Sequence, residues 1–339
     1  MMTEYLKYSI QYRRLLMRFP LGPGPYRERL LDAMAWLLVD LHRAGVFWGD
    51  CSLANTLFRR DGDKIQAFLV DAETSEIHPR LSDGQRAYDL DILVENVAFG
   101  LADVAAMQRR PEAFDDAVAA AEMVRTTYTS IWDELHHEPV FSPYDRHAIR
   151  SRIRRLNEIG FAVDEIRMEP TAAGSGTGAV RLKVAVSNRR FHARELERST
   201  GILALEGQAR LLLNDLHEYR AWLESYDKRP IPEKEGAERW LHEVFEPTLE
   251  VLAPAIGGSR DLVQAYCDVL EEKWILSEMV GTDVGLEAAL DAYLGLGAPA
   301  PEDDRGSSES TIALDIDWSE GLDTPDPDPT AVAAVDDEA

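Results

Sequence analysis

Apolar positions with helical spacing run through much of the first half of the chain. In residues 26–44 they form a single stripe, consisting of Leu30, Met34, Leu37, Leu38 and Leu41. Gly45 marks the end of this predicted helix, because glycine readily adopts the left-handed conformation that terminates helices. Residues 90–135 show the same spacing, and Pro111 divides them because proline cannot continue a helix. The pattern therefore predicts long helices on both sides of a short segment of different character.

That intervening segment carries two short runs of strand-forming residues. Residues 55–58 and 66–70 are the runs, and Asp61-Gly62 between them is a dipeptide that favours a tight turn. Such a turn folds the two strands into an antiparallel hairpin. Asn55, at the start of the first strand, is then expected close to Asp71, at the end of the second.

The second half of the chain mixes a few strands with more helices. Residues 161–166 are a possible strand, and residues 180–186 alternate with strand period. Helical patterns follow near residue 188, at 208–226, at 236–252, at 259–279 and up to Leu294. The predicted fold class is α+β and mainly helical.

Composition suggests three regions. A shift occurs near Glu138-Pro139 and Pro143, and proline and acidic residues dominate after Gly297. We expect a first domain at 1–140, an α-rich second domain at 141–296, and an acidic disordered tail at 297–339.

Charge limits the partners that the chain is expected to bind. The formal net charge is -25, and after residue 300 there are 13 acidic residues and a single arginine. Such a surface repels a phosphate backbone, so nucleic-acid binding is not expected overall. The basic region 146–198 keeps a nucleic-acid-binding regulator open as an alternative. However, Arg194 and Arg198 alternate with glutamates there, which is typical of a solvated or domain-facing surface.

Other features of the composition point to the cytoplasm. The two cysteines, Cys51 and Cys267, form neither a disulfide framework nor a metal-binding spacing. The N-terminal residues lack the pattern of a signal peptide, and no apolar run reaches membrane-spanning length.

The hairpin segment also holds the candidate chemistry. Asp50 lies in the loop that enters the first strand, Asn55 begins that strand, and Asp71 ends the second. Three oxygen-bearing side chains can therefore face one cleft. Hard oxygen ligands of this kind suit Mg²⁺, which often binds one or two carboxylates together with waters and substrate phosphates.

The stretch V-F-W-G-D-C-S-L-A-N, followed by the hairpin and D-A-E, resembles the catalytic and metal loops of the protein-kinase-like superfamily. The resemblance implies that Asp50 is the catalytic base and that Asn55 and Asp71 hold Mg²⁺ beside ATP. It also implies that Asp89 hydrogen-bonds the backbone of the catalytic loop. Trp48 replaces the usual histidine, and D-A-E replaces D-F-G. The short segment that follows suits a lipopolysaccharide, sugar or small-molecule kinase better than a regulated protein kinase.

The first residues resemble the hinge whose backbone contacts adenine, which makes Glu4, Tyr5 and Leu6 candidate nucleotide-binding residues. The glycine-rich loop, lysine and glutamate of a kinase small lobe have no counterpart in this sequence. We therefore expect a large lobe lacking most of the N-lobe. It is either part of an ATP-dependent phosphotransferase acting on a sugar or other small hydroxyl compound, or an inactive pseudokinase scaffold that binds a protein partner through its second domain.

Residues 150–294 resemble an uncharacterised bacterial family, the domain of unknown function DUF4032, which follows a lipopolysaccharide-kinase-like lobe. Two motifs carry this resemblance: L-L-L-N-D-L-H-E-Y-R at 211–220 and K-W-I-L-S-E-M-V-G-T-D-V-G at 273–285. The family implies an architecture and no reaction.

Overall fold

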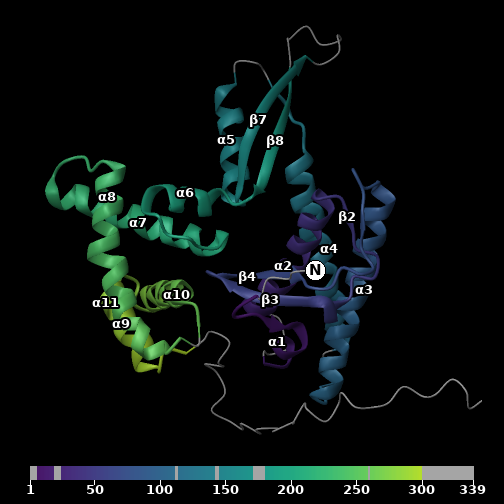
Figure 1. The fold of residues 1–339 in the computed structure, drawn as a ribbon, viewed down its shortest axis with the longest axis horizontal. Coiled ribbons are helices and arrows are strands. Elements are labelled where there is room, and N and C mark those ends of the chain that lie inside the picture. Colours follow the sequence, from purple (N-terminus) through teal and green to yellow (C-terminus); the bar gives the residue numbers. More distant parts are fainter. Residues whose placement is uncertain are drawn as a thin grey trace, which may run out of the picture. The chain divides into compact units, whose positions relative to one another are not determined.

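The computed structural model describes residues 6–18, 24–110, 114–141, 145–170, 180–258 and 260–299. Within these ranges the chain is mainly helical with a few small antiparallel sheets, which confirms the predicted fold class (Figure 1). None of the helices in the described part combines the length and the apolar character needed to cross a membrane.

The N-terminal elements surround a small sheet. Strands β3 and β4 form the predicted hairpin, and β1 adds to the outer edge of β3. Strands β2 and β5 make a separate two-stranded pair. The bounds are β1 Ile10–Gln11, α1 Tyr12–Arg18, α2 Pro25–Arg43, β2 Val46–Phe47, β3 Thr56–Asp61, β4 Lys64–Leu69, β5 Glu76–Ile77, α3 Asp83–Met107 and α4 Phe114–His136.

Helix α2 buries the stripe that its sequence predicts. Leu38 is fully buried and Met34 is 2% exposed, and α2 packs against α4 and β4. Gly45 follows the helix with a φ of +78°, the left-handed conformation expected of a terminating glycine. Burying a leucine of this kind contributes about 1.5–3 kcal/mol. The apolar stripe is thus what holds α2 in the core.

The helix containing Asp89 begins earlier than its apolar pattern suggests. The apolar pattern starts at residue 90, whereas Ser82 is the N-cap of α3. The Ser82 hydroxyl accepts a hydrogen bond from the Gln85 N–H, and the Gln85 side chain accepts one from the Ser82 N–H. This reciprocal pair is a capping box, so capping by polar residues sets the start of the helix before any apolar residue appears.

The next elements form a long hairpin beside a helix. Strands β7 and β8 run antiparallel, with β6 on the other side of β8, and α5 contacts β7 (Figure 1). The bounds are β6 Val140–Phe141, α5 Arg146–Glu158, β7 Phe161–Pro170 and β8 Val180–Arg189.

The remaining elements are helices: α6 Phe191–Thr200, α7 Glu206–Asp227, α8 Glu233–Trp240, α9 Glu246–Ile256, α10 Leu262–Val280 and α11 Leu286–Gly295. The helix predicted at 236–252 is present, since the chain is helical from Glu233 to Ile256, but a π-helical turn at Leu241–Phe245 divides it into α8 and α9. Pro247 explains the change. It has no N–H to donate to the preceding turn, and the wider π turn accommodates its ring.

The described residues bury two apolar cores. The first includes residues from Leu15 to Phe161, and the second runs from Ala193 to Ala298. Leu156 and Phe161, which belong to the predicted second domain, pack in the first core. The proposed boundary at residue 141 stays a prediction, but the change from one core to the other lies between β8 and α6.

Candidate functional site

Asp89 fixes the loop that follows β2. This carboxylate is fully buried, and it accepts hydrogen bonds from the backbone N–H groups of Trp48 at 2.7 Å and Gly49 at 2.8 Å. The Cys51 thiol donates to the Asp89 carbonyl oxygen at 3.2 Å. The sequence-based hypothesis gave Asp89 contacts of this type with the loop backbone. Both ends of the 48–51 segment are therefore attached to one residue of α3.

His42 completes the buried network behind this loop. Its Nε2 lies 3.1 Å from the Asp89 carboxylate, and its Nδ1 lies 2.7 Å from the Tyr128 hydroxyl. Burial lowers the pKa of His42, although the neighbouring Asp89 acts in the opposite direction. A neutral imidazole fits both contacts, because Nε2–H donates to Asp89 and Nδ1 accepts from Tyr128. Burial also raises the pKa of Tyr128 to about 12, which keeps the hydroxyl available as a donor.

Asp50 lies in a constrained part of the loop. Its Oδ1 accepts a hydrogen bond from the Ser52 N–H, and its carbonyl oxygen accepts one from the Asn96 side chain at 2.8 Å. Cys51, the next residue, has a φ of +45°. A non-glycine residue in this region persists only where surrounding contacts enforce it, and such strain is frequent at functional loops. The Asp50 side chain itself is half-buried.

Strand pairing brings the neighbourhoods of Asn55 and Asp71 together. Thr56 pairs with Leu69, and the Val70 N–H donates to the Asn55 carbonyl oxygen at 2.9 Å. Asn55 therefore lies opposite the residue that precedes Asp71. Asp71 is exposed, and its Oδ1 accepts from the Glu73 N–H.

The loop after Asp71 also contacts the loop before Asn55. The Thr74 hydroxyl lies 3.4 Å from the Trp48 carbonyl oxygen, and a Cβ on Gly49 would lie 3.3 Å from the Thr74 carbonyl oxygen. The structure thus places all three predicted residues on adjoining segments at the open end of the hairpin.

The donor chemistry at this end fits Mg²⁺. Asp50 and Asp71 supply carboxylates and Asn55 supplies an amide oxygen, which are the hard oxygen ligands that this ion prefers. Within the described ranges no side chain is hydrogen-bonded to the Asn55 amide or to Asp71 Oδ2. Nowhere in the described part of the chain do three or more His, Cys, Asp and Glu side chains form a group that could hold a metal ion. A metal here would therefore depend on the amide and on ligands from the substrate.

Of the three predicted hinge residues, Glu4 and Tyr5 lie outside the described residues. Leu6 is half-buried, and its carbonyl oxygen accepts a hydrogen bond from the Ser9 hydroxyl at 2.9 Å. The following β1 pairs with β3, with Ile10 opposite Phe58.

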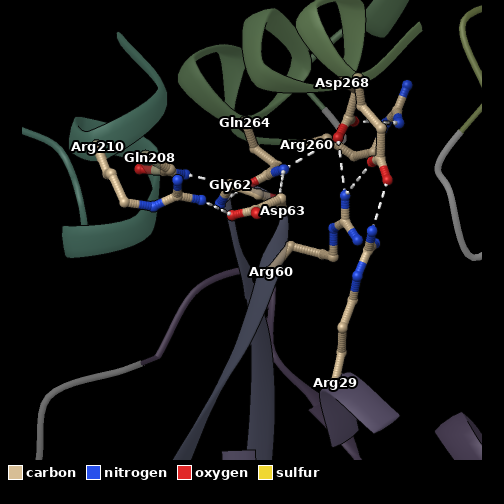
Figure 2. Close-up of polar contacts among 10 residues, drawn as sticks. Arg29, Arg60, Gly62, Asp63, Gln208, Arg210, Arg260, Gln264 and Asp268 are labelled. Carbon is tan, nitrogen blue, oxygen red and sulfur yellow. Dashed lines mark hydrogen bonds and ion pairs between the residues drawn. The ribbon is translucent and has the colours of Figure 1, made fainter. Parts of the chain in front are cut away.

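The opposite end of the hairpin is buried against α7 and α10 (Figure 2). The turn consists of Gly62 and Asp63, since Asp61 pairs with Lys64. Gln264 on α10 makes two hydrogen bonds with Gly62, accepting from its N–H at 2.8 Å and donating to its carbonyl oxygen at 2.9 Å. These bonds satisfy both backbone polar groups of the turn glycine.

Asp61 binds the first turn of α7. Its carboxylate is 4% exposed and accepts a hydrogen bond from the Gln208 N–H at 2.9 Å. Burial raises the pKa of Asp61, and the helix N–H groups oppose this effect. A side-chain oxygen at this position acts as a helix cap supplied by a distant segment. The hairpin turn therefore completes α7.

Two glycines allow this close approach. A Cβ on Gly207 would lie 2.2 Å from the Asp61 carbonyl oxygen, and one on Gly62 would lie 2.8 Å from the Gly207 carbonyl carbon. Neither position has room for a side chain.

Ion pairs surround the same contact. Arg60 lies 3.3 Å from Asp268 and 3.1 Å from Glu271, Arg29 lies 2.8 Å from Glu271, and Arg210 lies 2.6 Å from Asp63. The Arg60 and Asp268 side chains are 9% and 2% exposed. We call this set of contacts, which joins residues 60–63 and Arg29 of α2 to helices α7 and α10, the hairpin clamp.

Sequence reasoning missed the clamp and interpreted Asp61-Gly62 as a turn alone. A signal was present on α10, where Gln264, Asp268 and Glu272 recur four residues apart, and apolar residues flank the first two. All three are buried. A polar row of this kind on a packed helix indicates a specific polar partner.

The basic region 146–198 is mostly accounted for by internal contacts. Arg152 is 1% exposed and pairs with Glu134, Lys183 pairs with Glu169 at 2.9 Å, and the Arg189 guanidinium lies over the Trp36 ring. Glu165 pairs with Arg167 at 2.8 Å. These contacts use several of the region's cations within the protein, and we do not propose nucleic-acid binding.

The comparisons with known proteins bear on the second part of the chain. Residues 130–296 match a family model. Its description is Domain of unknown function (DUF4032). No curated protein and no solved structure matches the chain. The match includes α7 and α10, the helices of the hairpin clamp, while the hairpin itself precedes it.

Proposed function

We propose that the open end of the β3–β4 hairpin is the site of an ATP- and Mg²⁺-dependent phosphotransferase, acting on the hydroxyl group of a sugar or another small molecule. One observation carries the proposal. The loop with Asp50, held by the buried Asp89, adjoins the segment that ends at Asn55 just before β3 and the segment after β4 that bears Asp71.

In this proposal Asp50 accepts the proton of the acceptor hydroxyl as its oxygen forms a bond to the γ-phosphorus, and the bond from that phosphorus to the bridging oxygen of ATP breaks to release ADP. Asn55 and Asp71 would hold Mg²⁺, which when bound neutralises charge on the phosphates. Asp89 and His42 keep the loop in place and do not touch the substrate.

The test is calorimetric titration of the full chain with ATP in the presence of Mg²⁺. Asp71→Ala is expected to weaken binding by about tenfold or more, because one metal ligand is lost. Glu73→Gln is the matched control, since this neighbouring exposed carboxylate has no proposed role. Unchanged binding in Asp71→Ala, or an equal loss in the control, would exclude the metal role.

A protein-binding scaffold without catalysis is the second candidate. Helix α7 exposes Trp222 and Tyr226 at 55% and 72%, and their rings stack with centroids 5.4 Å apart. Exposed aromatic residues are enriched at protein interfaces. If the folded chain binds neither ATP nor Mg²⁺ in the titration, the scaffold candidate replaces the phosphotransferase.

A further inference from the structure

Helices α7 and α10 enclose a cleft of about 910 Å³ that the proposed function does not use. Its polar lining includes Asn214 and Glu218 from α7, Lys273, Trp274 and Ser277 from α10, and Asp283 from the following loop. A volume of this order is typical of sites for small ligands. The cleft lies beside the hairpin clamp, whose residues Arg29 and Asp63 form one end of it.

The two motifs singled out in the second half of the sequence meet in this cleft. Asn214 and Glu218 belong to the motif at 211–220, and Lys273, Trp274 and Asp283 belong to the motif at 273–285. The two motifs are about 60 residues apart along the chain, and only the packing of α7 on α10 brings them together.

Charge in the cleft favours a cation as the ligand. Lys273 Nζ lies 3.4 Å from Glu218 and 3.6 Å from Asp283, so one ammonium serves two carboxylates. Both carboxylates are 70% exposed, whereas Lys273 is 18% exposed. At the other end the cations are already paired, Arg29 with Glu271 and Arg210 with Asp63. An anionic ligand would have to displace a carboxylate from one of these pairs.

Trp274 supplies a complementary aromatic surface. Its side chain is 65% exposed although it lines the cleft, and Leu211 and Leu270 add apolar wall. The face of an indole ring attracts organic cations, and a neighbouring carboxylate strengthens that attraction. An alkyl body would cover the leucines while the charged group lies near Glu218 and Asp283.

We propose that the α7–α10 cleft binds a small organic cation of the alkylammonium class. The inference does not depend on the phosphotransferase proposal, because Asp50, Asn55 and Asp71 do not line the cleft. Asp63, which does line it, belongs to the opposite end of the hairpin.

The test compares two probes of the same shape in titrations of the full chain. Choline carries a quaternary ammonium, and 3,3-dimethyl-1-butanol is its neutral isostere. At about 0.15 M salt, which screens the general negative field of the protein, choline is expected to bind at least about tenfold more tightly than the alcohol. Binding is also expected to shift the indole N–H signal of Trp274 in the NMR spectrum.

Two variants and two matched controls locate the site. Trp274→Ala and Asp283→Asn change exposed side chains of the cleft, and each is expected to weaken choline binding by about tenfold. Trp222→Ala removes an exposed tryptophan of α7 outside the cleft, and Glu287→Gln removes an exposed carboxylate of α11. Neither control should change the affinity.

Three results would overturn the proposal. They are the absence of choline binding, equal binding of the alcohol, and a loss of affinity in the controls as large as in the cleft variants. The last result would mean that choline senses only the overall negative charge.

Discussion

The two ends of the β3–β4 hairpin differ in what their polar residues do. At the open end Asp71 is exposed and Asp50 is half-buried, and among the described residues their carboxylates accept hydrogen bonds only from backbone groups two residues away. At the turn end Asp61 is buried and accepts a hydrogen bond from α7, and the buried Asp268 of α10 pairs with Arg60 of β3. Polar groups that serve stability are buried and satisfied, whereas polar groups that serve a ligand keep access to solvent. The same hairpin thus carries one anchored end and one available end.

The largest effect is expected from Gly207→Ala at the anchored end. The new methyl group would overlap the Asp61 carbonyl oxygen, which is backbone and cannot rotate away. We expect a loss of about 3–4 kcal/mol in the free energy of unfolding, measured by chemical denaturation. Gly295→Ala is the control, because nothing lies within 4 Å of the added atom. Equal stability of the two variants would show that the close contact is not required.

Arg60→Met at the same end should cost about 2 kcal/mol, because it removes the shared cation between Asp268 and Glu271 in a buried setting. The remaining pairs from Arg29 and Arg260 limit the loss. Arg167→Met removes an exposed pair with Glu165 and should leave the free energy of unfolding close to that of the wild type. Amide hydrogen exchange of residues 56–69 gives the local measurement, and faster exchange is expected only in Arg60→Met.

Lowering the pH tests the buried contact between His42 and Asp89, the residue that holds the loop at the open end. Burial lowers the pKa of His42 below its ordinary value of 6.5, so the unfolded chain binds this proton more readily than the folded one. The stability that neutral His42 contributes is complete above pH 6.5 and is lost as the pH falls toward the folded pKa. His42→Gln should make stability less dependent on pH in this range, since its amide can donate to Asp89 without titrating. A pH dependence identical to that of the wild type would refute the assignment.

The smallest effect on stability is expected from Asp71→Ala at the available end. Because this carboxylate is exposed and its hydrogen bond within the described part of the chain comes from the Glu73 N–H, the free energy of unfolding should change by less than about 0.5 kcal/mol. The same substitution is expected to weaken nucleotide binding. A large loss of stability would mean that Asp71 is a structural residue, and the contrast between the two ends would disappear.

The sequence alone determined the features that depend on neighbours in the chain. The α2 stripe, the stop at Gly45, the hairpin and the nearness of Asn55 to Asp71 all follow from periodicity and turn chemistry within a few residues. Polar capping at Ser82 and the π turn before Pro247 also have local causes, but their effect on element boundaries is weaker than apolar spacing and is easily overlooked.

Only the tertiary structure decided which distant residues meet. Asp61 caps α7, Gln264 binds Gly62, and the motifs at 211–220 and 273–285 share one cleft. Spacing along the chain cannot reveal such contacts, because the local sequence around an aspartate or glutamine does not show whether its side chain lies in a solvated turn or in a buried network. Packing of the two helices on the hairpin excludes water from these groups, and it is this loss of water that makes a specific partner necessary.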